Sequence, residues 1–453
     1  MSDTKLDLLK GNILKSLIIF AIPLFISNLF QQLYNTADTM IVGHFLGDSS
    51  LAAIGACTAV YELLVGFALG IGNGMSMVVA RSYGAGDEAR LKRAVAGSIV
   101  IGAGVTVVVM IVSKLFLYPL MEILQTPREI IEESYSYISL LTICVGVMFA
   151  YNLLAGLLRA IGNSVMPLVF LVTSSVINVV LDVVFITQFS MGVKGAAVAT
   201  VLAQGISALL CLLYIFRKTK LLIPDREHFK IESRLYGELV GQGLSMGFML
   251  AIVSMGTVIL QFAINKLGYL IIAGHTAARK LSSFCTMPLI TLALATATFV
   301  SQNRGADQKE RIVKAVRYAN WLSLIWSGLI TVVLFFTAPA LVKLLSGSTE
   351  TVVIENGANY LRINAPLYSV LGILLVLRNS LQGLGKKIVP LVSSVIELLG
   401  KIVFVVLLIP TLNYFGVIIC EPVIWCLMCA QLAFAFYTDP YIRKKKNPYE
   451  KVD

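Results

Sequence analysis

Charged side chains are scarce in this chain: Asp, Glu, Lys and Arg make up 13% of its 453 residues, whereas apolar residues make up 57%. Soluble domains carry about 25% charged residues, so this composition excludes a water-soluble monomer. A membrane-spanning helix needs about 20 mainly apolar residues, and such runs recur without the alternation of a transmembrane β-barrel. The sequence therefore predicts an all-α membrane protein with twelve transmembrane helices, at 16–44, 50–78, 94–118, 134–158, 167–188, 195–216, 237–264, 270–298, 314–338, 357–381, 388–410 and 415–438.

Catalytic and metal-binding patterns are also lacking. The seven cysteines are scattered, and we interpret them as small hydrophobic residues. Cys426 and Cys429 have the spacing of a metal-ligand pair, but no second pair accompanies them. The glycine-rich stretch at 70–74 lies within an apolar run, and no Walker A sequence occurs. We therefore expect neither an enzyme nor a cofactor, and energy must come from an ion gradient or a partner.

The chain has a net charge of +11, and most of its basic residues lie in the loops between the expected spans. Basic residues gather after every second span, while the intervening loops carry at most one basic residue each, such as Lys194 and Lys266. The gathered residues are Arg81, Arg90, Lys92, Arg93, Arg217, Lys218, Lys220, Arg226, Lys230, Arg234, Arg304, Lys309, Arg311, Lys314, Lys386, Lys387, Arg443, Lys444, Lys445 and Lys446. The positive-inside rule then places both termini in the cytoplasm. We expect the protein to lie in a bacterial inner membrane. Because the charge follows topology, nucleic-acid binding is not expected.

The first apolar run begins near Ser16 and is too long for the core of a signal peptide. We therefore expect no cleavable leader, and this run remains as the first span.

The chain repeats itself. Short motifs at 84–85 and 94–95 recur at 305–306 and 315–316, and the motif Ser-Ser-Val-Ile at 174–177 recurs at 393–396. Each half has six spans, so the halves have the same orientation, as in a parallel repeat of a transporter. The predicted parts are an N-terminal six-helix lobe, a cytoplasmic linker, a C-terminal six-helix lobe and a basic cytoplasmic tail, at 1–216, 217–236, 237–438 and 439–453.

Polar residues interrupt three spans of the first half. Ionisable residues within a membrane are costly and indicate function by default. Asp38 lies in the first span, Asn178 and Asp182 share a face of the fifth at a spacing of four, and Thr200 lies in the sixth with the Ala196 carbonyl one turn before it. Such oxygens suit a hard cation, and two close carboxylates can instead take up protons. A purely structural polar cluster, with Asp38 capping a helix end, is the alternative.

The second half carries its own charges. Glu397 and Lys401 stand four residues apart in the eleventh span, and Lys280 follows Arg279 in the eighth. Opposite charges at this spacing can pair and lower each other's cost. They are either a structural ion pair or part of a substrate or gating site. Further candidates for substrate binding or gating are Tyr34, Asn35 and Asn152.

Several motifs together resemble the multidrug and toxic compound extrusion (MATE) family, and the resemblance covers nearly the whole chain. The run at 32–43 looks like the family's first-helix signature, and the stretches at 157–163 and 381–385 are similar to family motifs as well. So are 192–200 and Glu421-Pro422. The resemblance implies two six-helix lobes arranged as a V around a central cavity. It also implies a monomer that exports cationic or amphipathic drugs or metabolites by antiport with H⁺ or Na⁺.

The resemblance is to the DinF-like branch, and it implies a cation site in the N-terminal lobe. Carried onto this sequence, that site comprises Asp38, Asn178, Asp182, Ala196 and Thr200. The NorM-like branch also has an acidic residue midway along the seventh helix, but the stretch at 243–253 contains no carboxylate. A second cation site of that type is therefore not expected.

Two other functions remain open at this point. A lipid-linked oligosaccharide flippase of the same superfamily would need a basic cavity for pyrophosphate, and Arg279, Lys280 and Lys401 keep this alternative open. A membrane-embedded signalling or assembly protein is the second. The substrate and the choice between H⁺ and Na⁺ do not follow from the sequence.

Overall fold

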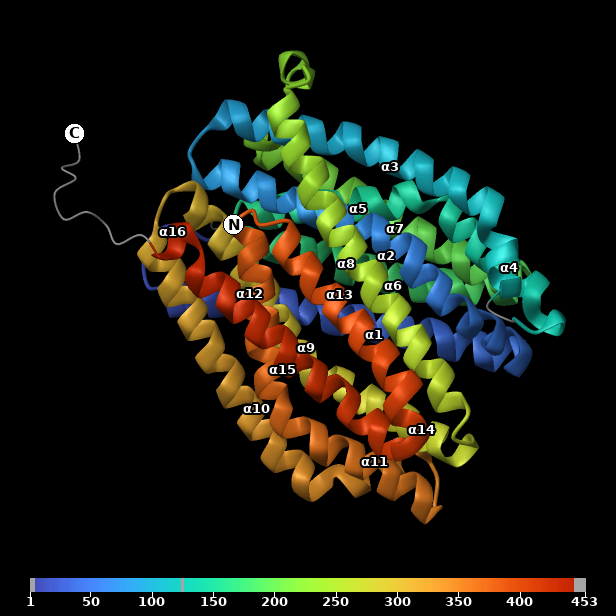
Figure 1. Cartoon of the computed structure of the whole chain (residues 1–453). Coiled ribbons are helices and arrows are strands. Elements are labelled where there is room, and N and C mark those ends of the chain that lie inside the picture. The colour runs from blue at the N-terminus through green and yellow to red at the C-terminus, as the bar shows by residue number, and fades with distance from the viewer. Residues whose placement is uncertain (1–4, 124–125, 444–453) are drawn as a thin grey trace. The chain divides into compact units, whose positions relative to one another are not determined.

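The computed structural model describes residues 5–123 and 126–443, apart from the side chains of residues 48, 58 and 59. All regular secondary structure in this part of the chain is helical (Figure 1). Eleven helices are long and apolar enough to span a membrane, and a bent helix pair supplies the twelfth span. The predicted all-α class with twelve spans is therefore confirmed. Lys444, Lys445 and Lys446 of the predicted tail lie outside the described residues.

The helices fall into two compact units, 1–258 and 259–453. Unit 1 holds α1 (Ile13–Leu46), α2 (Asp48–Gly84), α3 (Glu88–Ile123), α4 (Arg128–Ile143), α5 (Val145–Ala160), α6 (Val165–Thr187), α7 (Val193–Lys218), the short η1 (Lys220–Leu222) and η2 (Arg226–Phe229), and most of α8 (Ser233–Asn265). Unit 2 holds α9 (Tyr269–Gly305), α10 (Lys309–Ser346), α11 (Thr351–Asn364), η3 (Ala365–Leu367), α12 (Tyr368–Gly383), α13 (Ile388–Val403), η4 (Phe404–Leu408), α14 (Ile409–Leu412), α15 (Tyr414–Thr438) and α16 (Pro440–Arg443).

The division into units falls inside α8, whereas the repeat divides the chain before α8. The difference arises because the first part of α8 packs closely on α2. The expected lobes at 1–216 and 237–438 are defined by the sequence repeat, whereas the two units are defined by which helices pack together.

Backbone features of the first half recur at equivalent positions of the second half. Gly47 and Gly268 both have positive φ angles, of 88° and 100°, at the turn between the first two helices of each half. Glycine adopts such angles without the Cβ penalty of other residues. The fourth span bends by 49° at Cys144, between α4 and α5. The tenth breaks at η3, where Pro366 lacks the amide hydrogen that a continuous helix needs. Both halves thus break the same span.

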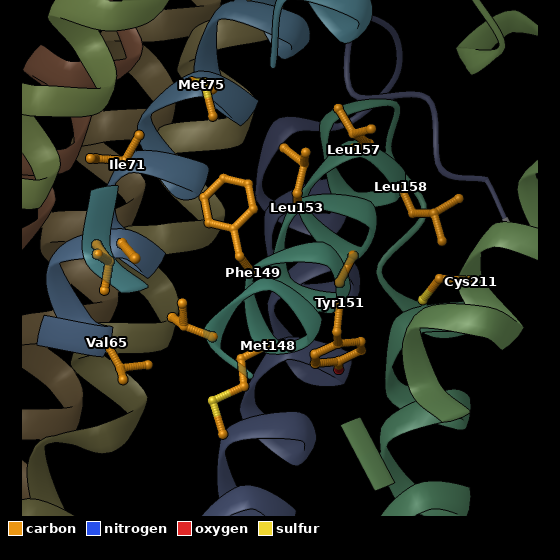
Figure 2. Close-up of a cluster of buried hydrophobic side chains, with 14 of the residues drawn as sticks. Val65, Ile71, Met75, Met148, Phe149, Tyr151, Leu153, Leu157, Leu158 and Cys211 are labelled. Atoms are coloured by element: carbon orange, nitrogen blue, oxygen red, sulfur yellow. The ribbon is translucent and has the colours of Figure 1, made fainter. Parts of the chain in front are cut away.

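The core of unit 1 is built around α5. Phe149 and Leu153 point into a cluster that includes Ile71 and Met75 of α2 (Figure 2). Cys211 of α7 is fully buried in the same cluster. The interpretation of this cysteine as a small hydrophobic residue is consistent with that position.

Glycines allow α2 and α8 to cross at backbone contact distance. A Cβ atom added to Gly74 would lie 2.4 Å from the carbonyl oxygen of Gln242, and one added to Gly70 would lie 2.8 Å from the Cα of Gly247. Small residues at such crossings let membrane helices approach closely, and dispersion contacts then drive their association. The glycines at 70–74 therefore serve packing.

Replacing Gly74 with alanine should lower the melting temperature of the purified protein. The added methyl group cannot move away from a backbone oxygen, so one helix must shift, at a cost of about 1–3 kcal/mol. Gly104→Ala on α3 is the matched control, because a Cβ at Gly104 meets no atom within 4 Å. Equal melting temperatures for the two variants would contradict the proposed role of the crossing.

Candidate functional site

Three helices of unit 1 bring the predicted polar residues together. α6 packs against both α1 and α7. The Thr200 hydroxyl on α7 donates a long hydrogen bond of 3.5 Å to Oδ2 of Asp38 on α1. The carboxyl groups of Asp38 and Asp182 are close enough to interact electrostatically. Asp38, Asn178, Asp182 and Thr200 are called the unit-1 carboxylate site below.

Burial at this site is severe for such polar groups. Asn178 and Asp182 on α6 are 1% and 0% exposed. Oδ1 of Asp38, both carboxylate oxygens of Asp182 and both amide atoms of Asn178 are buried and accept or donate no hydrogen bond within the described residues. Buried polar atoms in native proteins are almost always paired, and an unpaired one costs about 1–3 kcal/mol. The donor set is rich in oxygen, which fits a small hard cation or a proton.

Ala196 lies one helical turn before Thr200 on α7. It is 2% exposed and belongs to an apolar cluster with Val42, Ile186 and Val193. Val42, Ile186 and Ala196 stand four residues from Asp38, Asp182 and Thr200, so this cluster lies one helical turn from the unit-1 carboxylate site. The role of the Ala196 carbonyl as a ligand stays a prediction.

A small cavity adjoins the site. Its volume is about 10 Å³, and its lining includes Tyr34, Ser174, Asn178, Thr200 and Gln204. That volume is close to the threshold of about 10–15 Å³ for one water molecule. The Gln204 amide donates a hydrogen bond of 3.4 Å to the Tyr34 hydroxyl. Sequence reasoning missed Gln204, although its spacing of four from Thr200 places it on the same face of the span.

Two other candidates stand on α1 and α5. Asn35 is exposed on α1. Asn152 on α5 donates its amide hydrogen to the Met148 carbonyl of its own helix at 2.9 Å. Their proposed role in substrate binding or gating stays a prediction.

A carboxylate that the sequence reasoning passed over lies on α2. Glu62 falls within an apolar run and is exposed, and the Ser254 hydroxyl of α8 donates to it at 3.4 Å. Glu62 could have been identified from the sequence, because it is an ionisable residue inside a predicted span.

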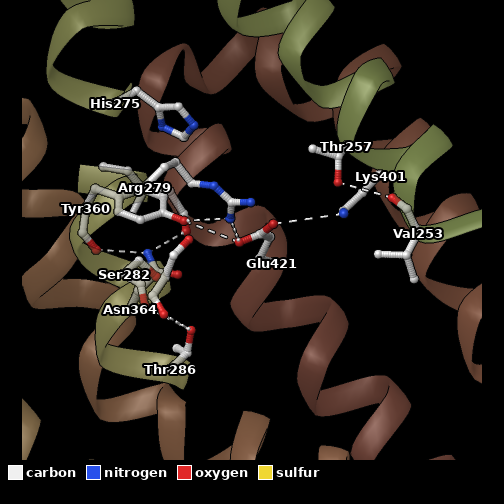
Figure 3. A network of polar contacts seen from close by, with 12 residues as sticks. Val253, Thr257, His275, Arg279, Ser282, Thr286, Tyr360, Asn364, Lys401 and Glu421 are labelled. Atoms are coloured by element: carbon white, nitrogen blue, oxygen red, sulfur yellow. Dashed lines mark hydrogen bonds and ion pairs between the residues drawn. The ribbon is translucent and has the colours of Figure 1, made fainter. Parts of the chain in front are cut away.

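Unit 2 holds a second polar group, built around Glu421 (Figure 3). Arg279 on α9 donates to Oε2 of Glu421 at 2.7 Å, and the Tyr360 hydroxyl on α11 donates to the same oxygen at 3.3 Å. Nζ of Lys401 lies 2.9 Å from Oε1 of Glu397 and 3.9 Å from Oε1 of Glu421. Arg279, Tyr360, Glu397, Lys401 and Glu421 are called the unit-2 charged network below.

The predicted pairing of Glu397 with Lys401 is therefore present in the structure. Lys280 is exposed and takes no part in the network, whereas its neighbour Arg279 is the basic residue that joins it. His275 lies beside the network, 3.2 Å from the Tyr414 hydroxyl, with its ring edge-on to Tyr360. It is a hydrogen-bonded interior histidine.

Side chains of metal-binding types are scattered through the described helices. No group of three or more His, Cys, Asp or Glu side chains that could hold a metal ion occurs among residues 5–123 and 126–443. All seven cysteines are free, and Cys426 is exposed.

Solved structures of known transporters have the same fold. A structure described as an outward-facing conformation of a multidrug resistance MATE family transporter of the MOP superfamily matches with a TM-score of 0.89 and 22% identity, covering 98% of this chain and 100% of that one. A MOP superfamily transporter from Pyrococcus furiosus, described as having a binding pocket of reverse polarity, matches with a TM-score of 0.85 and 22% identity, covering 98% and 100%. At this identity the likeness concerns the fold alone.

Sequence relatives cover the chain almost completely. The probable multidrug resistance protein YoeA of Bacillus subtilis is 26% identical over 97% of this chain and 96% of its own length. The multidrug export protein MepA of Staphylococcus aureus (strain N315) is 22% identical over 93% and 92%. The MatE family model matches residues 23–184 and again residues 246–407, one match in each repeat. These two matches cover more than half of the sequence, and the chain is a multi-pass membrane transporter that belongs to the MatE family.

Proposed function

We propose that this transporter is an antiporter that couples the entry of H⁺ or Na⁺ to the export of a cationic or amphipathic organic molecule. The observation that carries the proposal is the unit-1 carboxylate site, where Asp38 and Asp182 meet in a buried setting with unpaired oxygens. The names of the multidrug relatives support an organic substrate.

The coupling follows from electrostatics. Two ionised carboxylates that face each other in a low-dielectric interior repel, because charges there are poorly screened. A proton or a sodium ion removes this repulsion, so α1 can pack more closely against α6 and α7. An ion drives such a change only to the extent that it binds one arrangement more tightly than the other. The ion is therefore expected to favour the arrangement that releases the substrate.

The flippase alternative is less well supported. It requires an unneutralised basic cavity for pyrophosphate, whereas Arg279 and Lys401 are each paired with a carboxylate. Of the three residues that kept this alternative open, Lys280 is the one without a carboxylate partner among the ion pairs of the described residues. The family relatives described above carry multidrug names rather than lipid-precursor names.

Efflux from proteoliposomes tests the proposal. Vesicles are loaded with a fluorescent cationic dye, and either an inward H⁺ gradient or an inward Na⁺ gradient is imposed alone. We expect one gradient to drive dye release, and an ionophore that dissipates this gradient to stop it. Protein-free vesicles are the control. Release that ignores both gradients, or no release with folded protein present, would contradict the proposal, and transbilayer movement of a lipid-linked precursor would then be measured.

A further inference from the structure

The two polar groups occupy equivalent places in the repeat. The motif Ser-Ser-Val-Ile at 174–177 on α6 returns at 393–396 on α13. Aligning the two copies of this motif places Asn178 on Glu397 and Asp182 on Lys401. An amide and a carboxylate in unit 1 thus correspond to a carboxylate and an ammonium group in unit 2.

The next helix gives the same correspondence from its backbone. α7 begins after Gly192, with φ 60° and ψ −147°, and α15 begins after Asn413, with φ 53° and ψ −135°. These two caps adopt nearly the same unusual conformation at equivalent points of the two halves. Thr200 and Glu421 are then both the eighth residue of their helices. The hydroxyl partner of Asp38 in unit 1 is therefore replaced in unit 2 by a carboxylate.

Pairing distinguishes the two places. In unit 1 both Asp182 oxygens, both Asn178 amide atoms and Oδ1 of Asp38 are buried without hydrogen-bond partners among the described residues. In unit 2 the Lys401 side chain is 3% exposed, and its ammonium group lies between the carboxylates of Glu397 and Glu421. The second oxygen of Glu421 is taken by Arg279. The ammonium group of Lys401 therefore stands at the position that the Asp182 carboxylate occupies in unit 1.

The residues around the two places also differ: they are apolar in unit 1 and polar in unit 2. The apolar cluster beside the unit-1 carboxylate site includes Ile54 and Val193. When the two halves are aligned on Gly47 and Gly268, their counterparts are His275 and Tyr414, which contact each other at 3.2 Å. Buried charges are tolerated only when hydrogen-bond partners satisfy them, and the His275 ring lies edge-on to Tyr360 of the charged network.

We propose that Lys401 is a tethered cation that permanently fills the unit-2 counterpart of the unit-1 carboxylate site. Removing its ammonium group uncovers a binding site for a small monovalent cation, an alkylammonium or alkali ion, between Glu397 and Glu421. The inference rests on the proposed function in one respect, since it takes the unit-1 carboxylate site to be the one that exchanges ions. The unit-2 counterpart in the wild type therefore exchanges no ion.

Chemical rescue of a Lys401→Ala variant tests the proposal. The melting temperature of the purified full chain in detergent is measured with ethylammonium, methylammonium or sodium chloride, and with choline chloride as the control for ionic strength. A ligand that binds only the folded state raises its stability by mass action. We expect Lys401→Ala to melt below the wild type, and at least one small cation to raise its melting temperature by about 2 °C or more relative to choline. The wild type should show a smaller rise, because an ion that stabilises it can bind only at the unit-1 carboxylate site.

Matched variants sharpen the outcome. Lys401→Arg keeps a cation in place and should show no rescue, and Lys401→Ala combined with Glu421→Gln should lose it. Lys401→Gln, which retains a hydrogen-bond donor, serves if the alanine variant does not fold. Rescue of Lys401→Ala should persist when Asp182→Asn is added to it. The result for unit 2 therefore does not depend on whether the unit-1 carboxylate site binds an ion. A folded Lys401→Ala or Lys401→Gln protein that ignores all three small cations overturns the inference.

Discussion

Gradient-driven efflux is expected to fall by about 10-fold or more when Asp38 is replaced with asparagine. Asparagine keeps the shape of the side chain and can still accept the hydrogen bond from Thr200. It cannot be neutralised by a proton, and it offers a sodium ion no negative charge. Asp182 then has no second carboxylate to repel, so an ion that binds it relieves no repulsion and biases the equilibrium between the two states far less. The measurement is dye efflux from proteoliposomes under the gradient that drives the wild type.

The control is the same chemical change at an exposed position. Asp87 is exposed, and its carboxylate accepts a hydrogen bond from the Arg90 amide at 2.8 Å, which asparagine can also do. Asp87→Asn should therefore retain efflux. Asp182→Asn should resemble Asp38→Asn, because either change leaves a single carboxylate. Full gradient-driven efflux by folded Asp38→Asn protein would remove the carboxylate pair from the coupling mechanism.

The largest loss of stability is expected from Glu421→Gln. This carboxylate is shared between Arg279 at 2.7 Å and Lys401 at 3.9 Å, and its side chain is only 11% exposed. Removing one partner of a buried ion pair costs about 3–5 kcal/mol, because the remaining charge is left uncompensated. The lower end is expected, since the Arg279 side chain is 37% exposed and is partly solvated. The melting temperature in detergent should fall by several degrees.

A double-mutant cycle isolates the interaction. Adding Arg279→Gln to Glu421→Gln removes the uncompensated guanidinium group, so the double variant should recover part of the loss. Glu355→Gln on α11 is the control, because Glu355 is exposed. If Glu421→Gln and the Glu355→Gln control have the same melting temperature, the network does not stabilise unit 2. If the double variant shows the sum of the two single losses, Arg279 and Glu421 do not interact.

Local patterns were sufficient for the spans and for most of the unit-1 carboxylate site. Apolar run length predicts transmembrane helices because the bilayer sets their length. The spacing of four between Asn178 and Asp182 placed both on one face of a helix, and the structure buries that face. The approach of Asp38 to Thr200 joins residues 162 positions apart. That contact was expected only through the family resemblance, because periodicity carries no information on which helices are neighbours.

The unit-2 charged network shows where such reasoning ends. Arg279 and Lys280 are adjacent in sequence, and successive helical residues point about 100° apart. Hydropathy does not reveal which of them faces the interior, and the structure selects Arg279. Its partner Glu421 lies 142 residues away on another helix. The pairing depends on the packing of α9, α11 and α15, which is a tertiary property.

The glycine crossing of α2 and α8 has a mechanical consequence. At Gly70 and Gly74 the neighbouring atoms are backbone atoms, whereas the side chains of Ile71 and Phe67 press on Gly243 and Gly247 of α8. Interlocked side chains resist sliding because they must leave one staggered rotamer well for another. The two backbone contacts set no such barrier, but the Ile71 and Phe67 side chains do. The crossing therefore fixes how closely α2 and α8 approach, and α8 turns against α2 only when these side chains repack.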